Sequence, residues 1–268
     1  MNPYFDLHKA FRSAGANVLM SSGQACVLFG IAAFSKDGDW IIEESEESCS
    51  AALRVLASKQ ARYRLGMPLD IRWLKRGWTS HFEYFLDSGF RMRVDFVSRP
   101  PRVPRIGRLW DVSSMIRNIE VVDVEDLVRL KQTRRVRDYS IIGALAESLG
   151  LRMGNVDIAL RYLQDYEHLK TAVARWPLEA ARSEREAVRL LHSGAPRRDV
   201  VIALALEQDD HIREDERRVE KLMKRSLPLR KAFSSLSHTW HREGRDLLRQ
   251  HRDLVEAALP VLGDSGNA

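Results

Sequence analysis

The stretch that decides the fold is Asn17-Val-Leu-Met-Ser-Ser-Gly-Gln-Ala-Cys-Val-Leu-Phe-Gly-Ile-Ala-Ala-Phe-Ser-Lys-Asp-Gly-Asp-Trp-Ile-Ile42. It opens with an apolar run of strand length, passes through a small turn with a glycine, continues as a helix over 23–33 and ends in a strand at 39–42. A helix that follows such a turn presents free backbone N–H groups to phosphate. The alternative is an ordinary helix start, capped by Ser22.

Two carboxylates, Asp37 and Asp39, stand at the start of the second strand. Residues two apart on a strand point to the same face, so we expect these side chains to project together. A third carboxylate, Asp95, lies in Arg93-Val-Asp-Phe-Val97. Mg²⁺ prefers oxygen ligands and binds one or two carboxylates together with substrate phosphates. The pattern predicts a two-metal site for phosphoryl chemistry, and a surface turn is the alternative for Asp-x-Asp alone.

The whole 17–42 pattern resembles the signature of the nucleotidyltransferase superfamily, which has a DNA polymerase beta-like fold. It is most similar to AbiEii-type and related minimal nucleotidyltransferases of bacteria and archaea. Their pattern is a Gly-Gly or Gly-Ser turn, a helix and a Ser/Thr-x-Asp-x-Asp strand. Leu127-Val-Arg-Leu-Lys-Gln-Thr-Arg-Arg-Val-Arg-Asp138 is similar to a second hallmark, a helix with a lysine before a basic-Asp element. The resemblance covers roughly residues 5–150.

The resemblance implies a metal-dependent enzyme that moves a nucleoside monophosphate from a nucleoside triphosphate to a hydroxyl of an RNA, a protein or a small molecule. Asp37, Asp39 and Asp95 are implied as the catalytic and metal-binding residues, with Mg²⁺ or Mn²⁺ as the cofactor. The implied nucleotide-binding residues are Ser22, Gly23, Lys36, Lys131, Arg135 and Arg137. Members of the family often act as toxins, so an antitoxin protein is an expected partner.

Two positions depart from the family pattern. Ser22 replaces the first glycine of the turn, which requires ordinary backbone angles there. Gly38 replaces the apolar residue between the aspartates, and a glycine weakens a strand by roughly 0.5–1 kcal/mol and packs nothing beneath the site. A second hypothesis therefore stays open, a catalytically inactive module of the same fold that binds nucleotide or RNA. The binding surface expected for this module consists of arginines at every third residue of a proline-rich stretch: Arg99, Arg102, Arg105 and Arg108. The alternative for this stretch is a solvated loop.

The remaining pattern predicts an α+β protein, with a small mixed-sheet core followed by a mostly helical C-terminal region. We expect a helix over 4–14, a surface helix over 50–60, a strand at 68–74, and a hairpin of 81–86 with 90–97. Helices are expected at 152–167, 183–192, 197–206, 209–224 and 235–258, with Pro228 separating the last two. The predicted parts are a nucleotidyltransferase-like domain at 1–150, a helical domain at 151–262 and a disordered tail at 263–268.

His81 and Glu83 lie on the first strand of the expected hairpin, near Asp95. His81 is a candidate for substrate contact or proton transfer, and Glu83 for a further acidic group in the site. Structural roles are the alternative for both.

The composition sets outer limits on partners and location. With 43 basic and 37 acidic residues the net charge is +6, which permits a phosphate-bearing partner without demanding one. Cys26 and Cys49 form neither a disulfide framework nor metal-ligand spacing. The longest apolar stretch, Ala25–Phe34, contains a glycine and is too short to span a bilayer, and we expect no secretory signal. We expect a cytoplasmic protein without membrane contact.

Overall fold

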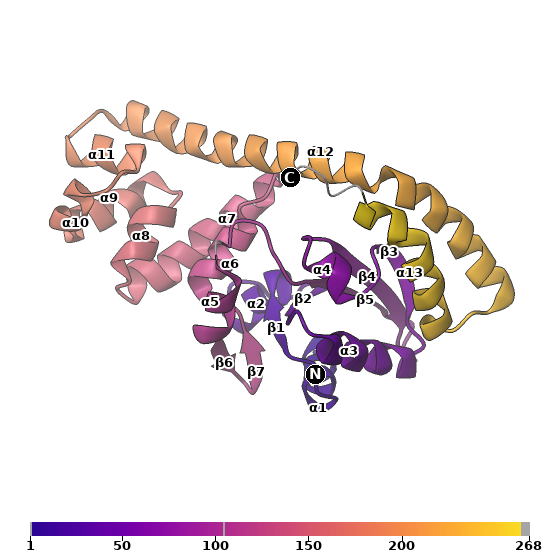
Figure 1. The fold of residues 1–268 in the computed structure, drawn as a ribbon. Helices are drawn as coiled ribbons and strands as arrows, with labels where there is room; N and C mark the ends of the chain where they lie inside the picture. Colours follow the sequence, from indigo (N-terminus) through magenta and orange to yellow (C-terminus); the bar gives the residue numbers. More distant parts are fainter. Residues whose placement is uncertain (1, 104, 264–268) are drawn as a thin grey trace. The chain divides into compact units, whose positions relative to one another are not determined.

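The computed structural model describes residues 2–103 and 105–263 and divides into two compact units. The first unit consists of Met1–Asp123 together with Leu222–Ala268, and the second of Val124–Lys221. A mixed sheet with flanking helices forms the first unit, and helices form the second (Figure 1). The predicted α+β class, with a long helical region toward the C-terminus, is confirmed.

The first unit contains all the strands of the described residues. Its elements before the second unit are α1 (Pro3–Ser13), β1 (Val18–Ser21), α2 (Ser22–Leu28), β2 (Gly38–Ile42), α3 (Glu46–Ser58), β3 (Arg62–Gly66), α4 (Ile71–Leu74), β4 (Thr79–Phe85), β5 (Arg91–Val97), α5 (Ile106–Asp111), β6 (Ser114–Ile116) and β7 (Ile119–Val121). The sheet order is β3-β4-β5-β2-β1-β7-β6. β2 and β5 pair in parallel, as do β1 and β7, and the other neighbours are antiparallel. The predicted hairpin is confirmed as β4–β5.

One face of the sheet carries the core of this unit. Trp40 of β2, Phe82 of β4 and Phe96 of β5 are at most 1% exposed and alternate along their strands with more polar positions. Phe11 of α1 meets Trp40 and Phe96 edge-on, at ring-centroid distances of 5.3 and 5.4 Å. α1 begins where the Asn2 side chain accepts a hydrogen bond from the backbone N–H of Tyr4. In β2, β4 and β5, the more polar residues that alternate with these buried rings point to the opposite face of the sheet.

The second unit is helical. It contains α6 (Val124–Lys131), α7 (Val136–Leu145), the π-helical segment η1 (Ala146–Arg152), α8 (Val156–Tyr162), α9 (Tyr166–Arg175), α10 (Pro177–Ala181) and α11 (Glu186–His192). The helix α12 (Arg197–Glu243) begins in the second unit and continues into the first. The last described helix, α13 (Leu247–Gly263), belongs to the first unit. Pro228 lies inside α12, so the predicted separation of two helices there is wrong. Within the described part of the chain, no helix has the length and apolar character that a membrane span requires.

Three local predictions need correction. The strand predicted at 68–74 is wrong, because the Asp70 side chain accepts a hydrogen bond from Arg72 N and starts the helix α4. The strand of this region is β3, which precedes it. α2 ends at Leu28 rather than near residue 33. α3 is not a surface helix, since residues such as Leu56 are fully buried.

The two units do not coincide with the predicted division at residues 150 and 262. α13 packs on α3, β3 and α4. Gln250 Oε1 accepts from the backbone N–H of Tyr63 in β3 at 3.0 Å, and Trp73 Nε1 of α4 donates to Ala258 O at 3.3 Å. α13 thus completes the core of the first unit (Figure 1). Gly263 ends α13, and residues 264–268 of the predicted tail lie outside the described residues.

Candidate active site

The sheet brings two of the predicted carboxylates side by side. β2 and β5 are neighbouring parallel strands, and their register pairs Asp39 with Asp95. Adjacent strands lie roughly 4.8 Å apart, and side chains at paired positions share one face. On the other side of β2, Ser21 of β1 is paired with Asp39. Asp37 directly precedes β2, so all three carboxylates lie close to the point where β1 leads into α2.

Two arginines contact the outer carboxylates of this group. Arg93 Nη1 lies 3.2 Å from Asp37 Oδ1, and Arg64 Nη2 lies 3.0 and 3.3 Å from the two oxygens of Asp95. Within residues 2–103 and 105–263, no three His, Cys, Asp or Glu side chains are grouped so that they could hold a metal ion. The carboxylate oxygens still have the chemistry that Mg²⁺ prefers. A cation bound here would have to replace the arginine contacts.

His81 of β4 is paired with Asp95 in the register of β4 and β5. Its Nδ1 lies 2.8 Å from Asp95 Oδ1, although the direction is not that of a hydrogen bond. Its Nε2 lies 2.8 Å from Thr79 Oγ1, and the tautomer decides which of the two donates. The predicted proximity of His81 and Asp95 is confirmed.

The junction between β1 and α2 has a strained residue. Ser22, the first residue of α2, has φ +54°, in the left-handed region that costs a non-glycine residue roughly 1–2 kcal/mol. The ordinary backbone angles that a serine requires here are therefore not present, and a glycine would suit the position better. The Ser21 hydroxyl donates to Asp39 O at 3.2 Å instead of capping α2, which ties the turn to β2. Strain of this kind is concentrated at functional sites.

Gly23 allows the loop before β2 to lie directly on the start of α2. A Cβ at this position would come within 2.2 Å of Ser35 Oγ. The buried Gln24 side chain donates from Nε2 to Ser35 O at 3.0 Å and to Asp37 O at 3.4 Å, and Ser35 Oγ donates to Asp37 O at 3.1 Å. These bonds fix the backbone from which the Asp37 carboxylate extends.

Gly38 lies under two buried rings. A Cβ there would be 2.5 Å from Tyr4 Cδ1 and 2.5 Å from the Trp40 ring, so these rings fill the space that an apolar residue 38 would otherwise occupy. The Tyr4 hydroxyl donates to Lys36 O at 2.5 Å, and burial raises the pKa of Tyr4. The Lys36 side chain is exposed. The expectation that nothing packs beneath the aspartates is wrong.

The second predicted hallmark lies in the second unit. Lys131 of α6 is only 5% exposed, and its Nζ is 3.8 Å from Asp138 Oδ1. Asp138 also accepts from Arg135 Nε and from Thr133 Oγ1, at 2.8 and 2.6 Å. Arg137 is exposed on α7. Lys131 and Arg135 are thus tied to one carboxylate, and the role of these residues as nucleotide ligands stays a prediction.

Other polar candidates have structural partners. Glu83 is buried between Arg91 and Arg62; burial raises its pKa, but the hydrogen bonds from Arg91 and then Arg62 outweigh this and leave the pKa lowered. Arg99 pairs with Glu44, Nε to Oε1 at 2.6 Å. Because α5 begins at residue 106, the three-residue repeat predicted for 99–108 does not extend into Arg108.

Four residues that hydrogen-bond to the backbone or the carboxylates of this site were not predicted from the sequence: Tyr4, Gln24, Arg64 and Arg93. A signal existed for Arg93, which is two residues before Asp95 and therefore shares its face of the strand. No sequence signal pointed to Arg64, because its position depends on the register irregularity between Tyr63 and Leu65 in β3.

No protein-family model and no curated protein matches this chain. A solved structure similar to it is that of JHP933 from Helicobacter pylori, with 13% sequence identity and a TM-score of 0.41. The match covers 83% of this chain and 97% of JHP933. A likeness of this size carries no argument about function.

Proposed function

We propose that the protein is a metal-dependent nucleotidyltransferase. One observation carries the proposal: the register that pairs Asp39 with Asp95, with Asp37 two residues upstream and the Ser22-Gly23 turn at the end of the adjacent strand. This is the arrangement that the family resemblance implies for a triphosphate held beside paired carboxylates. Gly38 supports it too, because the buried rings of Tyr4 and Trp40 fill the space beneath the aspartates.

In the proposed reaction, an acceptor hydroxyl oxygen forms a bond to the α-phosphorus of a nucleoside triphosphate. The bond from this phosphorus to the bridging oxygen breaks, and pyrophosphate leaves. A bound Mg²⁺ or Mn²⁺ supplies charge neutralisation at the phosphates. In this proposal Asp95, with His81 beside it, accepts the proton of the acceptor hydroxyl, and Ser22 and Gly23 hold phosphate oxygens. The acceptor class we propose is an RNA, a protein or a small molecule with a free hydroxyl, in a toxin that is paired with an antitoxin protein.

The test uses Asp37→Ala with an exposed turn aspartate, Asp87→Ala, as the matched control. Purified protein is incubated with each radiolabelled nucleoside triphosphate, Mg²⁺ or Mn²⁺, and total RNA and protein. Loss of a metal ligand should lower the transfer of label by at least about 100-fold, while the control keeps the wild-type rate. Transfer that survives Asp37→Ala would contradict the proposed role of this carboxylate.

The arginine contacts favour a second candidate, a catalytically inactive module that binds nucleotide or RNA. Arg93 and Arg64 already neutralise Asp37 and Asp95, as they would in a site that has lost its metal. This candidate predicts no transfer with any nucleotide, together with RNA binding in EDTA that Asp37→Ala leaves equal or makes stronger. Metal-dependent transfer by the wild type would exclude it.

A further inference from the structure

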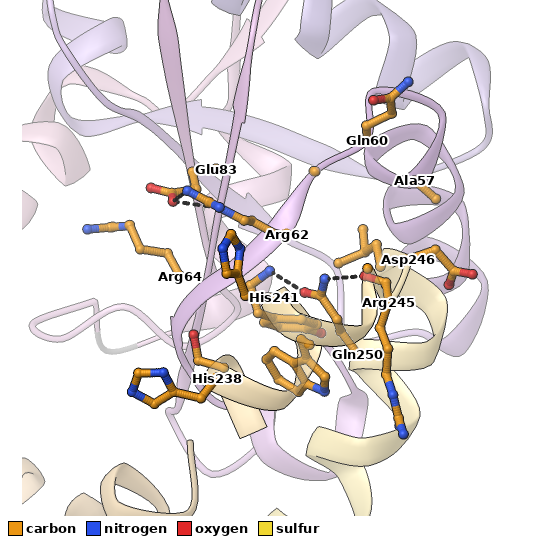
Figure 2. A pocket seen from close by; sticks show the side chains of 16 residues that line it. Ala57, Gln60, Arg62, Arg64, Glu83, His238, His241, Arg245, Asp246 and Gln250 are labelled. Atoms are coloured by element: carbon orange, nitrogen blue, oxygen red, sulfur yellow. Dashed lines mark hydrogen bonds and ion pairs between the residues drawn. The ribbon is translucent and has the colours of Figure 1, made fainter. Parts of the chain in front are cut away.

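A cavity of about 680 Å³ opens beside β3, at the edge of the sheet away from β2. It is lined by the end of α3 and the residues that follow it, by β3, by the last turns of α12 and by the first turns of α13, all within the first unit. Figure 2 shows Arg62 with its ion pair to Glu83 on the strand side, and His238 and His241 on the side of α12. None of these residues is needed by the proposed reaction at Asp37, Asp39 and Asp95.

Buried hydrogen bonds hold the walls of the cavity. Gln250 of α13 is 6% exposed; its Oε1 accepts from Tyr63 N at 3.0 Å, and its Nε2 donates to Arg245 O at 2.7 Å (Figure 2). Trp240 Nε1 donates to Asp253 Oδ2 at 2.7 Å, which joins α12 to α13. Because one amide bridges the strand and the connection between the helices, the cavity is a fixed feature of the fold.

The lining has more cationic than anionic groups. Arg62, Arg64 and Arg245 stand against Glu83 and Asp246, with the two histidines in addition. The Glu83 carboxylate is shared between Arg62 and Arg91, so Arg62 keeps donors that can take another anion.

Arg64 also lines the cavity. Its Nη2 contacts Asp95, so its guanidinium is already engaged by the carboxylate site. Arg62 and the histidines are therefore the cationic groups that this side of the cavity offers to a ligand.

The chemistry of the lining selects a class of ligand. Tyr63 and Trp240 are 3% and 4% exposed, so their rings are covered and offer no platform on which a base can stack. Guanidinium groups recognise phosphate through paired donors, and histidine and glutamine side chains can complete its shell. The volume is in the range of small-ligand pockets and exceeds what a bare phosphate fills. We propose that this cavity binds the terminal phosphate of a small phosphorylated metabolite, with Arg62 and His241 as its ligands.

The test measures binding of two probes, ribose 5-phosphate and inorganic phosphate, by isothermal titration calorimetry in EDTA without nucleoside triphosphate. Arg62→Gln should weaken binding by about tenfold or more, since a charge-assisted hydrogen bond to phosphate is lost. Glu83 keeps Arg91 as a partner in this variant, and circular dichroism checks that the fold is retained. Arg54→Gln is the matched control, because Arg54 is exposed on α3 and outside the lining.

Saturable binding of ribose 5-phosphate that depends on Arg62 and not on Arg54, and that is tighter than binding of inorganic phosphate, supports the proposal. Inorganic phosphate that binds as tightly as ribose 5-phosphate would overturn the assignment to a phosphorylated metabolite. No saturable binding of either probe, or equal weakening by both variants, would overturn it. The binding measurement needs no metal and no turnover, and it is repeated in Asp37→Ala. A lack of phosphate binding therefore leaves the transferase proposal standing. A lack of nucleotide transfer likewise leaves the cavity proposal standing.

Discussion

Gly38 is a closely packed residue of the candidate site. Its missing side chain leaves room for the rings of Tyr4 and Trp40, which are 1% and 0% exposed and cannot move toward solvent without opening the core. We therefore predict that Gly38→Ala destabilises the protein by about 1–3 kcal/mol, the usual cost of overpacking. Urea unfolding followed by tryptophan fluorescence measures the change.

The control for this substitution is Gly107→Ala in α5, where a Cβ would meet nothing within 4 Å. An alanine is the better helix former there, so we expect stability to stay equal or rise slightly. If Gly38→Ala were as well tolerated as Gly107→Ala, the packing of the rings over Gly38 would be contradicted.

His8 gives the first unit a stability that depends on pH. It is 1% exposed, Trp40 Nε1 donates to its Nδ1 at 3.3 Å, and burial followed by the nearby charges of Arg12 and Lys9 lowers its pKa to about 4. The unfolded chain takes up this proton near pH 6.5 and the folded chain only near pH 4, so stability is full above pH 6.5 and falls as the pH drops to 4. The loss should reach roughly 3 kcal/mol.

The measurement compares the free energy of unfolding at several pH values with that of His8→Gln, which keeps an acceptor but does not titrate. His251, whose pKa is also lowered by burial, is present in both proteins and cancels. The variant should lose less stability between pH 6.5 and pH 4 than the wild type. Identical pH profiles would show that His8 is not buried in a neutral form.

The carboxylates of the candidate site could be predicted from the sequence because strand alternation and a short motif place them. Asp39 and Asp95 are opposed by register, as the shared motif implied. The basic partners could not be predicted in the same way. Arg64 reaches Asp95 from a strand two positions away in the sheet, through a β-bulge that alternation does not reveal.

The helix α12 is continuous although the low helix propensity of proline opposes this at Pro228. Pro228 is exposed in its interior and cannot donate the backbone hydrogen bond that any other residue would. We predict that Pro228→Ala raises the stability of the first unit, by up to about 3 kcal/mol. Leu227→Ala is the control, since Leu227 is 51% exposed and should change little. Lower stability of Pro228→Ala in thermal unfolding would contradict a continuous helix through this position.

Helices and strands whose apolar residues recur with a clear period were predicted correctly. The helix α4, whose start depends on a single capping side chain, was not. α1, the β4–β5 hairpin and α6 follow their apolar patterns. The apolar run that precedes Leu74 has strand-like composition, yet Asp70 caps it as a helix, because one side-chain hydrogen bond outweighs a weak propensity. β6 and β7, of three residues each, are too short to show alternation.

For the whole molecule, the C-terminal segment belongs to the core of the first unit. Leu254 of α13 is fully buried, whereas Leu248 of the same helix is 47% exposed. We predict that Leu254→Ala costs about 2–5 kcal/mol and that Leu248→Ala costs little. Hydrogen exchange should show that Leu254→Ala reduces the protection of amides in β3 and β4. Reduced protection confined to residues 151–262 would instead support the division predicted from the sequence.

That division could not be corrected from the sequence alone. The first and last segments of the unit are separated by about a hundred residues of helix, and local patterns do not record which distant faces meet. Only the contacts in the structure show that the partners of α13 are α3, β3 and α4, for example those of Gln250 with Tyr63 and of Ala258 with Trp73.

The rings over Gly38 also have a consequence for how this sequence can change over time. Residues 4, 38 and 40 share one fixed volume, although they belong to a helix and a strand that are far apart in the chain. A larger side chain at 38 therefore becomes acceptable only after residue 4 or residue 40 has become smaller. Among homologues, we expect these positions to vary together, so that a chain with an apolar residue between its aspartates carries a smaller residue where this one has Tyr4.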